Sequence, residues 1–315
     1  MSVPTVSDPT VSPSGRTSGT QPLHGVLWML ASGLSFVAVT GIVRYLGTGL
    51  PAAQSAFLRF AWGLVLILPV LPRLLRSSPF AGFPADAAKV FLVRALFHTA
   101  AVMLWFYAMA RLPVAEVTAI GYLNPVVVTI GGVVIFGEAM AGRRVLAIAV
   151  ALVGALVILR PGLREISSGH LAQLGAATCF AGSYLCVKRL SAFAEPGLIV
   201  AVMTASVALG LLPFALWVWV PVSLAQLGWI AVVALCATSG HYCMTRAFVA
   251  APLSVTQPVS FLNLVWATAL GAVGFGETID PYVLLGGAII ILAISVLTWR
   301  ESLAQRRAAL DATTG

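Results

Sequence analysis

The sequence predicts an all-α integral membrane protein, in which ten transmembrane helices form two inverted five-helix repeats around a central cavity. Its composition, its apolar segments and an internal repeat lead to this prediction. Hydrophobic residues make up 60% of the 315 residues and charged residues only 9%, whereas soluble domains carry about 25% charged residues. So few charges cannot cover the surface of a soluble fold of this length. A surface that faces lipid, in contrast, should be apolar.

The apolar segments are long enough to cross a bilayer, for which a helix needs roughly 20 residues. Several begin at a proline, whose missing N–H costs nothing at the first helical position. Asp280, just ahead of Pro281, is expected to cap the last helix. The predicted spans are residues 24–46, 51–71, 89–110, 113–135, 143–160, 169–190, 196–218, 224–248, 253–274 and 281–299.

Two segments of the chain repeat each other, residues 113–138 and 252–277. Both begin with proline and end in Phe-Gly-Glu, and Leu123-Asn124 aligns with Leu262-Asn263 between these ends. The fourth and ninth spans are therefore equivalent. Because they are five spans apart, the second half must cross the membrane in the opposite direction, which is a common plan of secondary transporters. We predict repeats over 23–162 and 163–300, with a disordered tail at 1–22 and a charged tail at 301–315.

Basic residues predict the orientation, because cytoplasmic loops carry an excess of Lys and Arg. The loop after the fourth span contains Arg143 and Arg144, whereas its counterpart after the ninth span contains acids and no base. We therefore predict a bacterial inner-membrane protein with both termini in the cytoplasm. The excess of Lys and Arg in cytoplasmic loops also explains the net charge of +8, so we expect no nucleic-acid partner. In this orientation only four basic residues lie on the outer side of the membrane: Arg44, Arg111, Arg160 and Arg164.

Short motifs occur in a recognisable order between residues 58 and 277. They are Leu58-Arg59-Phe60, Tyr107-Ala108-Met109, Leu112-Pro113, Phe136-Gly137-Glu138, Arg160-Pro161-Gly162, Thr245-Arg246-Ala247, Ala251-Pro252, Leu264-Val265-Trp266-Ala267 and Phe275-Gly276-Glu277. In order and spacing they resemble the EamA type of the drug/metabolite transporter superfamily, over about residues 24–300. The resemblance implies a ten-helix carrier. Members of the family commonly export amino acids and other metabolites, and some take up solutes such as S-adenosylmethionine or riboflavin.

The resulting hypothesis is a transporter of small metabolites that works by alternating access and exports amino acids and related compounds. The alternative is an uptake carrier for a nucleoside-like or vitamin solute. A membrane enzyme is a more distant alternative, because the sequence contains no HExxH or GxSxG motif. A channel is also a more distant alternative, because the inverted repeat fits a carrier better. No Cys/His set has metal-ligand spacing, so we expect no metal and no cofactor. The expected partners are a small-molecule substrate and the lipid bilayer, with the chain as a monomer or a weak dimer.

Ionisable residues inside the predicted spans each need a partner or a function. For Arg59 the alternatives are a site for a substrate carboxylate and, as the favoured interpretation, snorkelling or bonding to helix-end carbonyls. Snorkelling is also favoured for Arg94. Glu116 lies in the first turn of its helix, where the helix dipole favours an acid, so we expect no proton relay there. His98 and His241 remain as candidates for proton coupling, although a structural role is commoner for histidine.

The candidate substrate-binding residues are polar or aromatic and share helix faces. Asn124-Pro125 and Gln257-Pro258 predict irregular helix beside the pathway, because a proline inside a span frees a backbone carbonyl. For each candidate, helix packing with an internal hydrogen bond is the alternative. The predicted substrate-binding set is His98, Trp105, Thr118, Tyr122, Asn124, Tyr184, His241, Gln257, Phe261 and Asn263.

Overall fold

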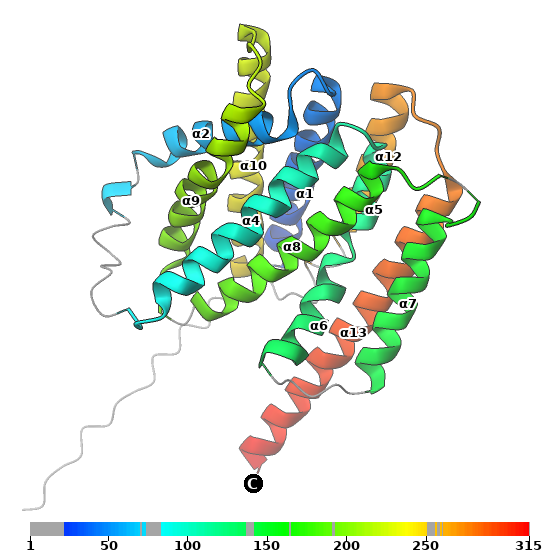
Figure 1. The fold of residues 1–315 in the computed structure, drawn as a ribbon. Helices are drawn as coiled ribbons and strands as arrows, with labels where there is room; N and C mark the ends of the chain where they lie inside the picture. Colours follow the sequence, from blue (N-terminus) through cyan, green and yellow to red (C-terminus); the bar gives the residue numbers. More distant parts are fainter. Residues whose placement is uncertain are drawn as a thin grey trace, which may run out of the picture.

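The computed structural model describes residues 22–69, 71–73, 83–136, 142–163, 165–190, 193–250, 256, 259 and 261–314. Within these ranges the regular elements are helices, which confirms the all-α prediction (Figure 1). The first half contains α1 (Pro22–Leu46), α2 (Ala52–Ile67), α4 (Ala87–Met109), α5 (Val114–Gly121), α6 (Asn124–Phe136) and α7 (Gly142–Leu159). The second half contains α8 (Ser168–Leu190), α9 (Pro196–Trp217), α10 (Leu224–Ala250), α12 (Leu262–Phe275) and α13 (Pro281–Thr314).

Six helical stretches in the described part are long and apolar enough to cross a membrane. Three shorter apolar helices, 52–67, 144–159 and 262–275, accompany them. Helix α8 has 23 residues but carries more polar side chains, and several of these, including His170, Gln173 and Ser183, are buried in the protein. The six long spans are Leu23–Leu46, Ala87–Met109, Val114–Ile135, Gly197–Trp217, Leu224–Met244 and Pro281–Arg300.

The fourth predicted span is broken in the middle, as its Asn124-Pro125 pair predicts. Helix α5 ends at Gly121 and α6 begins at Asn124, and the residues between them form tight turns, with Tyr122 N–H donating to the carbonyl of Ala119. The Asn124 amide donates to the carbonyl of Ala177 on α8 at 3.1 Å. The broken helix is thus held by a polar side chain from its own second segment. The corresponding Gln257-Pro258 pair lies outside the described residues.

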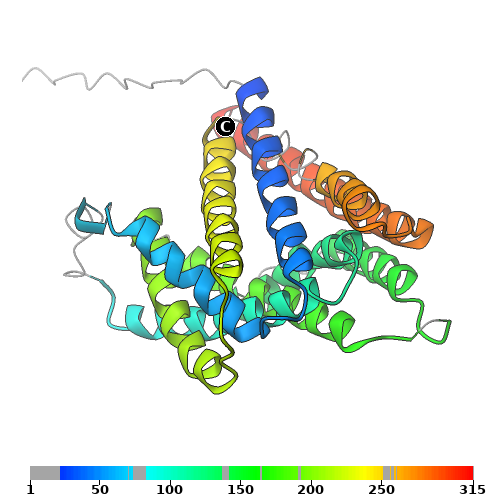
Figure 2. The same ribbon diagram turned by 90° about the horizontal axis from the view of Figure 1, so that it is seen from above.

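Helices of the two halves pack against each other in pairs. Helix α1 runs along α10 and α4 along α8, while α2 packs on α9 and α7 on α13. Figures 1 and 2 both show α1 beside α10, and α7 with α13 as a pair at one side of the molecule. The largest buried apolar cluster includes residues of α1, α2, α4, α9 and α10, and a second cluster joins α5 to α7 and α13.

Glycines allow α7 and α13 to approach closely. A Cβ added at Gly154 would lie 2.7 Å from the carbonyl oxygen of Gly286, and one added at Gly286 would lie 2.4 Å from the carbonyl oxygen of Gly154. Small residues permit such backbone contact between membrane helices. Helix α13 does not end with the predicted span but continues to Thr314, through residues 301–314 of the predicted tail.

Ion pairs connect helices at one end of the bundle. The Arg44 Nε lies 3.1 Å from Glu277 Oε1, and Glu277 Oε2 accepts the backbone N–H of Val114 at 3.0 Å. Arg160 pairs with Asp280, whose other carboxylate oxygen accepts the N–H of Tyr282. The second contact confirms the N-cap predicted for Asp280. The Glu277 contacts thus connect α1 and α5 to the segment after α12, and the Arg160–Asp280 pair connects the end of α7 to the start of α13.

Arg94 differs from its sequence prediction, because it does not snorkel. Its side chain is buried, and it donates to the carbonyl of Ile199 at 2.7 Å and to the sulfur of Met203 at 3.2 Å. Both partners belong to α9, whose first turn begins at Pro196. Arg94 therefore joins α4 to α9, and the charge is stabilised within the protein rather than at the membrane surface.

Candidate substrate cavity

A cavity of about 330 Å³ lies between the two halves of the chain. Helices α1, α2, α4, α5 and α6 line it from the first half, and α8, α10 and α12 from the second. Its lining consists of Phe36, Val37, Thr40, Arg59, His98, Val102, Trp105, Phe106, Val117, Thr118, Gly121, Tyr122, Asn124, Gln173, Ala177, Phe180, Tyr184, Ala237, His241, Met244 and Asn263. This volume is at the lower end of small-molecule sites, which measure roughly 300–1,000 Å³.

One wall of the cavity is an array of aromatic rings centred on Phe180. The Trp105 ring meets Phe180 edge to face, with centroids 5.9 Å apart, and Tyr184 stacks on Phe180 at 6.3 Å with an angle of 18° between the planes. His98 contacts the same ring at 5.2 Å. Trp105 and His98 lie on one face of α4, two turns apart, and Phe180 and Tyr184 are one turn apart on α8. The array therefore belongs to the interface between these two helices.

The two histidines in the cavity lining are held differently. His98 Nδ1 lies 3.0 Å from the hydroxyl of Ser183 on α8, and the His98 ring also contacts Phe60. His241 on α10 meets the Phe36 ring of α1 edge to face at 5.0 Å. Each histidine thus contacts a helix of the other half, as expected for a structural role, and both rings also line the cavity.

Arg59 contributes the cavity's positive charge. It lies in the middle of α2, a helix of 16 residues, and its guanidinium is 4.0 Å from the centroid of the Phe60 ring. The side chain is partly exposed and borders the cavity. No carboxylate lines the cavity among the residues that the structure describes. This position differs from the favoured sequence interpretation, in which Arg59 snorkels or binds helix-end carbonyls.

Tyr122, which follows α5 in the broken fourth span, lines the cavity and contacts Phe261 just before α12. Their ring centroids are 5.7 Å apart at an angle of 85°. Asn263, two residues after Phe261, lines the cavity and packs against Gly33 of α1, where a Cβ would lie 2.0 Å from the Asn263 Oδ1. Any side chain at Gly33 would therefore displace Asn263 from its place.

Eight of the ten residues predicted for substrate binding line this cavity. Phe261 is not among the lining residues but contacts Tyr122, which is. Gln257 lies outside the described residues. Thr118 donates its hydroxyl to the carbonyl of Val114 in the preceding turn, as the packing alternative predicts. The eight that the structure brings together are His98, Trp105, Thr118, Tyr122, Asn124, Tyr184, His241 and Asn263.

Several cavity residues were absent from the predicted set, chiefly Arg59, Phe180 and Gln173. Phe180 lies four residues before Tyr184, so helical periodicity could have placed both on one face. Gln173 is buried, and its amide nitrogen donates to the carbonyl of Val117 at 3.0 Å, while its oxygen has no hydrogen-bond partner in the described part of the chain. The sequence indicates Gln173 only weakly, as a polar residue two helical turns before Phe180.

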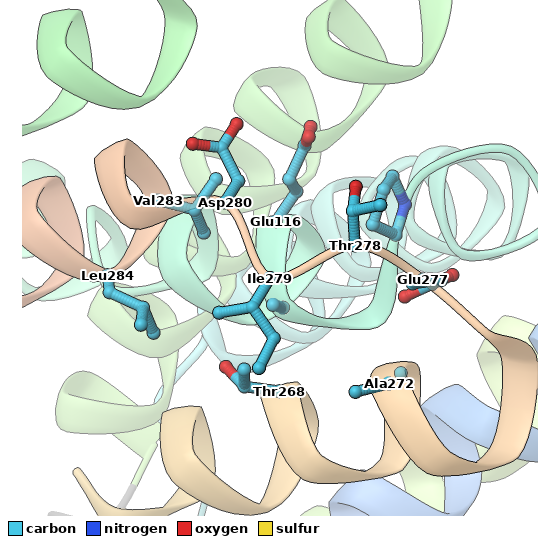
Figure 3. A pocket seen from close by; sticks show the side chains of 12 residues that line it. Glu116, Thr268, Ala272, Glu277, Thr278, Ile279, Asp280, Val283 and Leu284 are labelled. Atoms are coloured by element: carbon cyan, nitrogen blue, oxygen red, sulfur yellow. The ribbon is translucent and has the colours of Figure 1, made fainter.

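A second cavity of about 360 Å³ lies at the end of the bundle where the ion pairs connect the helices. Figure 3 shows Glu116 and Asp280 pointing to the same side, away from Thr268 and Ala272 of α12. Glu116 is buried and lies 2.8 Å from the Nε2 of His170. The backbone N–H of Ser167 donates to Nδ1 of the same ring, as in a capping box at the start of α8. Glu116 therefore binds the α8 N-terminal turn through His170, a residue that the sequence analysis did not single out.

Comparison with known proteins agrees with this architecture. The chain is 28% identical over 299 residues to the riboflavin transporter of Vibrio cholerae, covering 91% of the chain and 96% of that protein. It is 24% identical over 279 residues to the pseudopaline exporter CntI of Pseudomonas aeruginosa, covering 87% and 95%. The S-adenosylmethionine uptake transporter of Rickettsia prowazekii is 25% identical over 287 residues, covering 89% and 94%.

A solved crystal structure shares the fold, with a TM-score of 0.55 and 18% sequence identity, covering 90% of this chain and 96% of that one. The model of the EamA-like transporter family matches twice, over residues 23–160 and 167–299. Together with the apolar helices, these matches make the chain a multi-pass membrane protein of a transporter family. The protein belongs to the EamA-like transporter family, whose model covers nearly all of its helices.

Proposed function

We propose that this protein is an alternating-access carrier of the bacterial inner membrane, and that its substrates are small metabolites with a flat aromatic or heteroaromatic ring. The aromatic array of Trp105, Phe180 and Tyr184 carries the proposal, because flat rings stack favourably on such side chains. A vitamin or nucleoside-like solute has this shape. The relatives include transporters named for riboflavin and for S-adenosylmethionine, which supports the same class.

The carrier mechanism rests on the two halves being inverted repeats. The helix pairing supports this, because exchanging the first five spans for the second five turns the pair α1 and α10 into the pair α8 and α4. The same exchange returns α2 with α9 and α7 with α13 to themselves. A cavity lined by both halves is then the place around which they rock.

Export of amino acids and related compounds is the second candidate function. It is supported by Arg59, whose guanidinium suits a carboxylate, and by the similarity to an exporter from Pseudomonas aeruginosa. The two candidates differ in the solute and in the direction of transport, and the carrier mechanism is common to both.

Counterflow in proteoliposomes tests the proposal. Vesicles that contain the purified protein are loaded with unlabelled riboflavin, a nucleoside, an aromatic amino acid or an aliphatic amino acid, and traces of the labelled solute are added outside. A carrier accumulates the label transiently against its gradient, whereas a channel only equilibrates it. We expect this accumulation with at least one ring-bearing solute. Counterflow with aliphatic amino acids alone would contradict the proposal that the substrates bear a flat ring. Absence of counterflow with every transported solute would contradict the carrier mechanism.

Substitutions at Trp105 test the aromatic array directly. Trp105→Ala should lower counterflow of the ring-bearing solute about 2- to 10-fold, because an aromatic contact is worth about 0.5–1.5 kcal/mol, while Trp105→Phe should keep most of it. Trp217→Ala is the matched control, since Trp217 is 90% exposed at the end of α9 and does not line the cavity. Equal rates for all three variants would remove Trp105 from the binding site.

A further inference from the structure

Arg59 and Arg94 are both arginines inside predicted membrane spans, but among the described residues only Arg94 has hydrogen-bond acceptors. Arg94 is buried and donates to the Ile199 carbonyl and the Met203 sulfur. Arg59, in contrast, has the face of the Phe60 ring as its described interaction. The Arg59 guanidinium borders the cavity, and its N–H groups have no acceptor among the residues that the structure describes. The Arg94 guanidinium, in contrast, joins two helices.

The acids of the described chain do not supply a counter-charge to Arg59. None of the described acids lines the cavity, and four of them have basic partners elsewhere, at the ends of helices. The pairs are Asp86 with Arg189, Glu116 with His170, Glu277 with Arg44, and Asp280 with Arg160. A charged side chain near the centre of a membrane span costs about 2.5–3.5 kcal/mol on insertion scales, so a binding partner for the Arg59 charge would be strongly favoured.

We propose that Arg59 binds an acidic group of the transported solute, so that the preferred substrates are flat-ring metabolites that carry a carboxylate or phosphate. This inference rests on the proposed function and names its substrate class. The guanidinium presents several N–H donors in a planar fork that matches carboxylate and phosphate oxygens. The aromatic array faces the same cavity, so one solute can place its ring on Phe180 and its acid on Arg59.

The neighbours of Arg59 favour an anion as well. His98 and His241 line the same cavity. An imidazole is neutral or positively charged, so neither side chain repels an anion. The Phe60 ring holds the guanidinium by a cation–π contact on one face and also touches His98. This contact fixes the position of the charge without consuming its hydrogen-bond donors, which leaves them for the solute.

A matched pair of probes tests the proposal on the purified full-length protein. Indole-3-acetate and indole-3-acetamide have the same ring and nearly the same shape, but only the first is an anion at neutral pH. Calorimetric titration should give a dissociation constant about 10-fold or more lower for the acetate, because hydrogen bonds to charged groups are worth about 1.5–3 kcal/mol. Equal binding of the two probes, or binding of neither, would overturn the proposal.

Variants assign the preference to Arg59. Arg59→Gln should reduce binding of the acetate to that of the amide, and Arg59→Lys should keep part of the difference, because it keeps the charge without the planar fork. Arg111→Gln removes the same charge outside the cavity, where Arg111 is exposed beside the Tyr107 ring, and should leave the preference unchanged. Since Arg59→Lys retains the cation, it remains informative if Arg59→Gln does not fold. A preference that survives in both Arg59 variants would contradict the assignment.

Counterflow separates this inference from the proposed function. Transport of a neutral ring-bearing solute without any preference for the acetate would overturn the role of Arg59 and leave the carrier in place. A clear preference for the acetate in a protein that shows no counterflow would have the opposite meaning, because the anion site would stand and the carrier mechanism would fail.

Discussion

Tyr122 meets Phe261 edge to face, although 139 residues separate them in the chain. The same spacing separates Pro113 from Pro252, the prolines that open the two repeated segments. The two rings are therefore equivalent residues of the two halves in contact with each other. This contact lies beside the cavity, whose lining includes Tyr122 and Asn263.

We expect Tyr122→Ala and Phe261→Ala each to lower the thermal unfolding midpoint and the counterflow rate. The two effects should not add, because both variants remove the same contact. A double-mutant cycle should give a coupling free energy of about 0.5–1.5 kcal/mol. Tyr122→Phe is the control, since it keeps the ring pair and removes the hydroxyl, which lies 3.5 Å from the Phe261 carbonyl. Strictly additive effects would show that the rings act independently.

The sequence predicts the part of this architecture that depends on periodicity and repetition. The break at Asn124-Pro125 follows from proline chemistry, and the position of Tyr122 opposite Phe261 is consistent with the repeat alignment. Apolar composition predicts the helices themselves, and the aromatic and polar residues on one face of α4 predict part of the cavity lining.

What the sequence did not predict depends on how the helices are rotated against one another. Arg59 and Arg94 both look like arginines inside an apolar span in the sequence. In the structure a carbonyl of α9 accepts a hydrogen bond from Arg94, whereas the rotation of α2 about its own axis places Arg59 at the cavity. Likewise, His170 stands at the beginning of a span, where it gives no sign of the Glu116 carboxylate that it meets from α5. Such tertiary partners require the packing of several helices to be known.

Gly154 should tolerate no side chain. A methyl group there would meet the Gly286 carbonyl at 2.7 Å and Ile290 at 2.8 Å, so α7 and α13 would have to separate. Overpacking of this kind costs about 1–3 kcal/mol, and we expect Gly154→Ala to lower the unfolding midpoint in detergent. Gly228→Ala is the control, because a Cβ at Gly228 meets nothing within 4 Å. If both variants unfold at the same temperature, the close helix contact does not limit stability.

Reporter fusions should show both termini in the cytoplasm, because the basic residues are concentrated in the loops on that side. A fluorescent protein fused after residue 315 is expected to fluoresce, and alkaline phosphatase at the same point is expected to be inactive. Phosphatase inserted after Gly162, in the loop between the two halves, should be active. The reverse pattern of activities would invert the orientation of the whole protein.

Glu277 should hold one end of the bundle closed. Its carboxylate binds Arg44 at the end of α1 and the Val114 N–H at the start of α5, and Arg44 also donates to the Ala110 carbonyl at 3.3 Å. Glu277 is only 11% exposed and Arg44 only 26%, so water weakens the pair less than it would a surface pair. In an alternating-access cycle these contacts must break whenever this end opens.

Glu277→Ala should therefore increase the exposure of the cavity at this end. In a variant whose four native cysteines are replaced by serine, a single cysteine at Thr118 should react faster with a membrane-impermeant thiol reagent added outside when Glu277→Ala is present. Glu277→Gln should give a smaller increase, because its amide oxygen can still accept the Val114 N–H. Asp86→Asn is the control, since Asp86 pairs with Arg189 at the opposite end of α4 in an exposed contact. An unchanged labelling rate in Glu277→Ala would show that other contacts keep this end closed, because the Thr118 position would then remain shielded without the carboxylate.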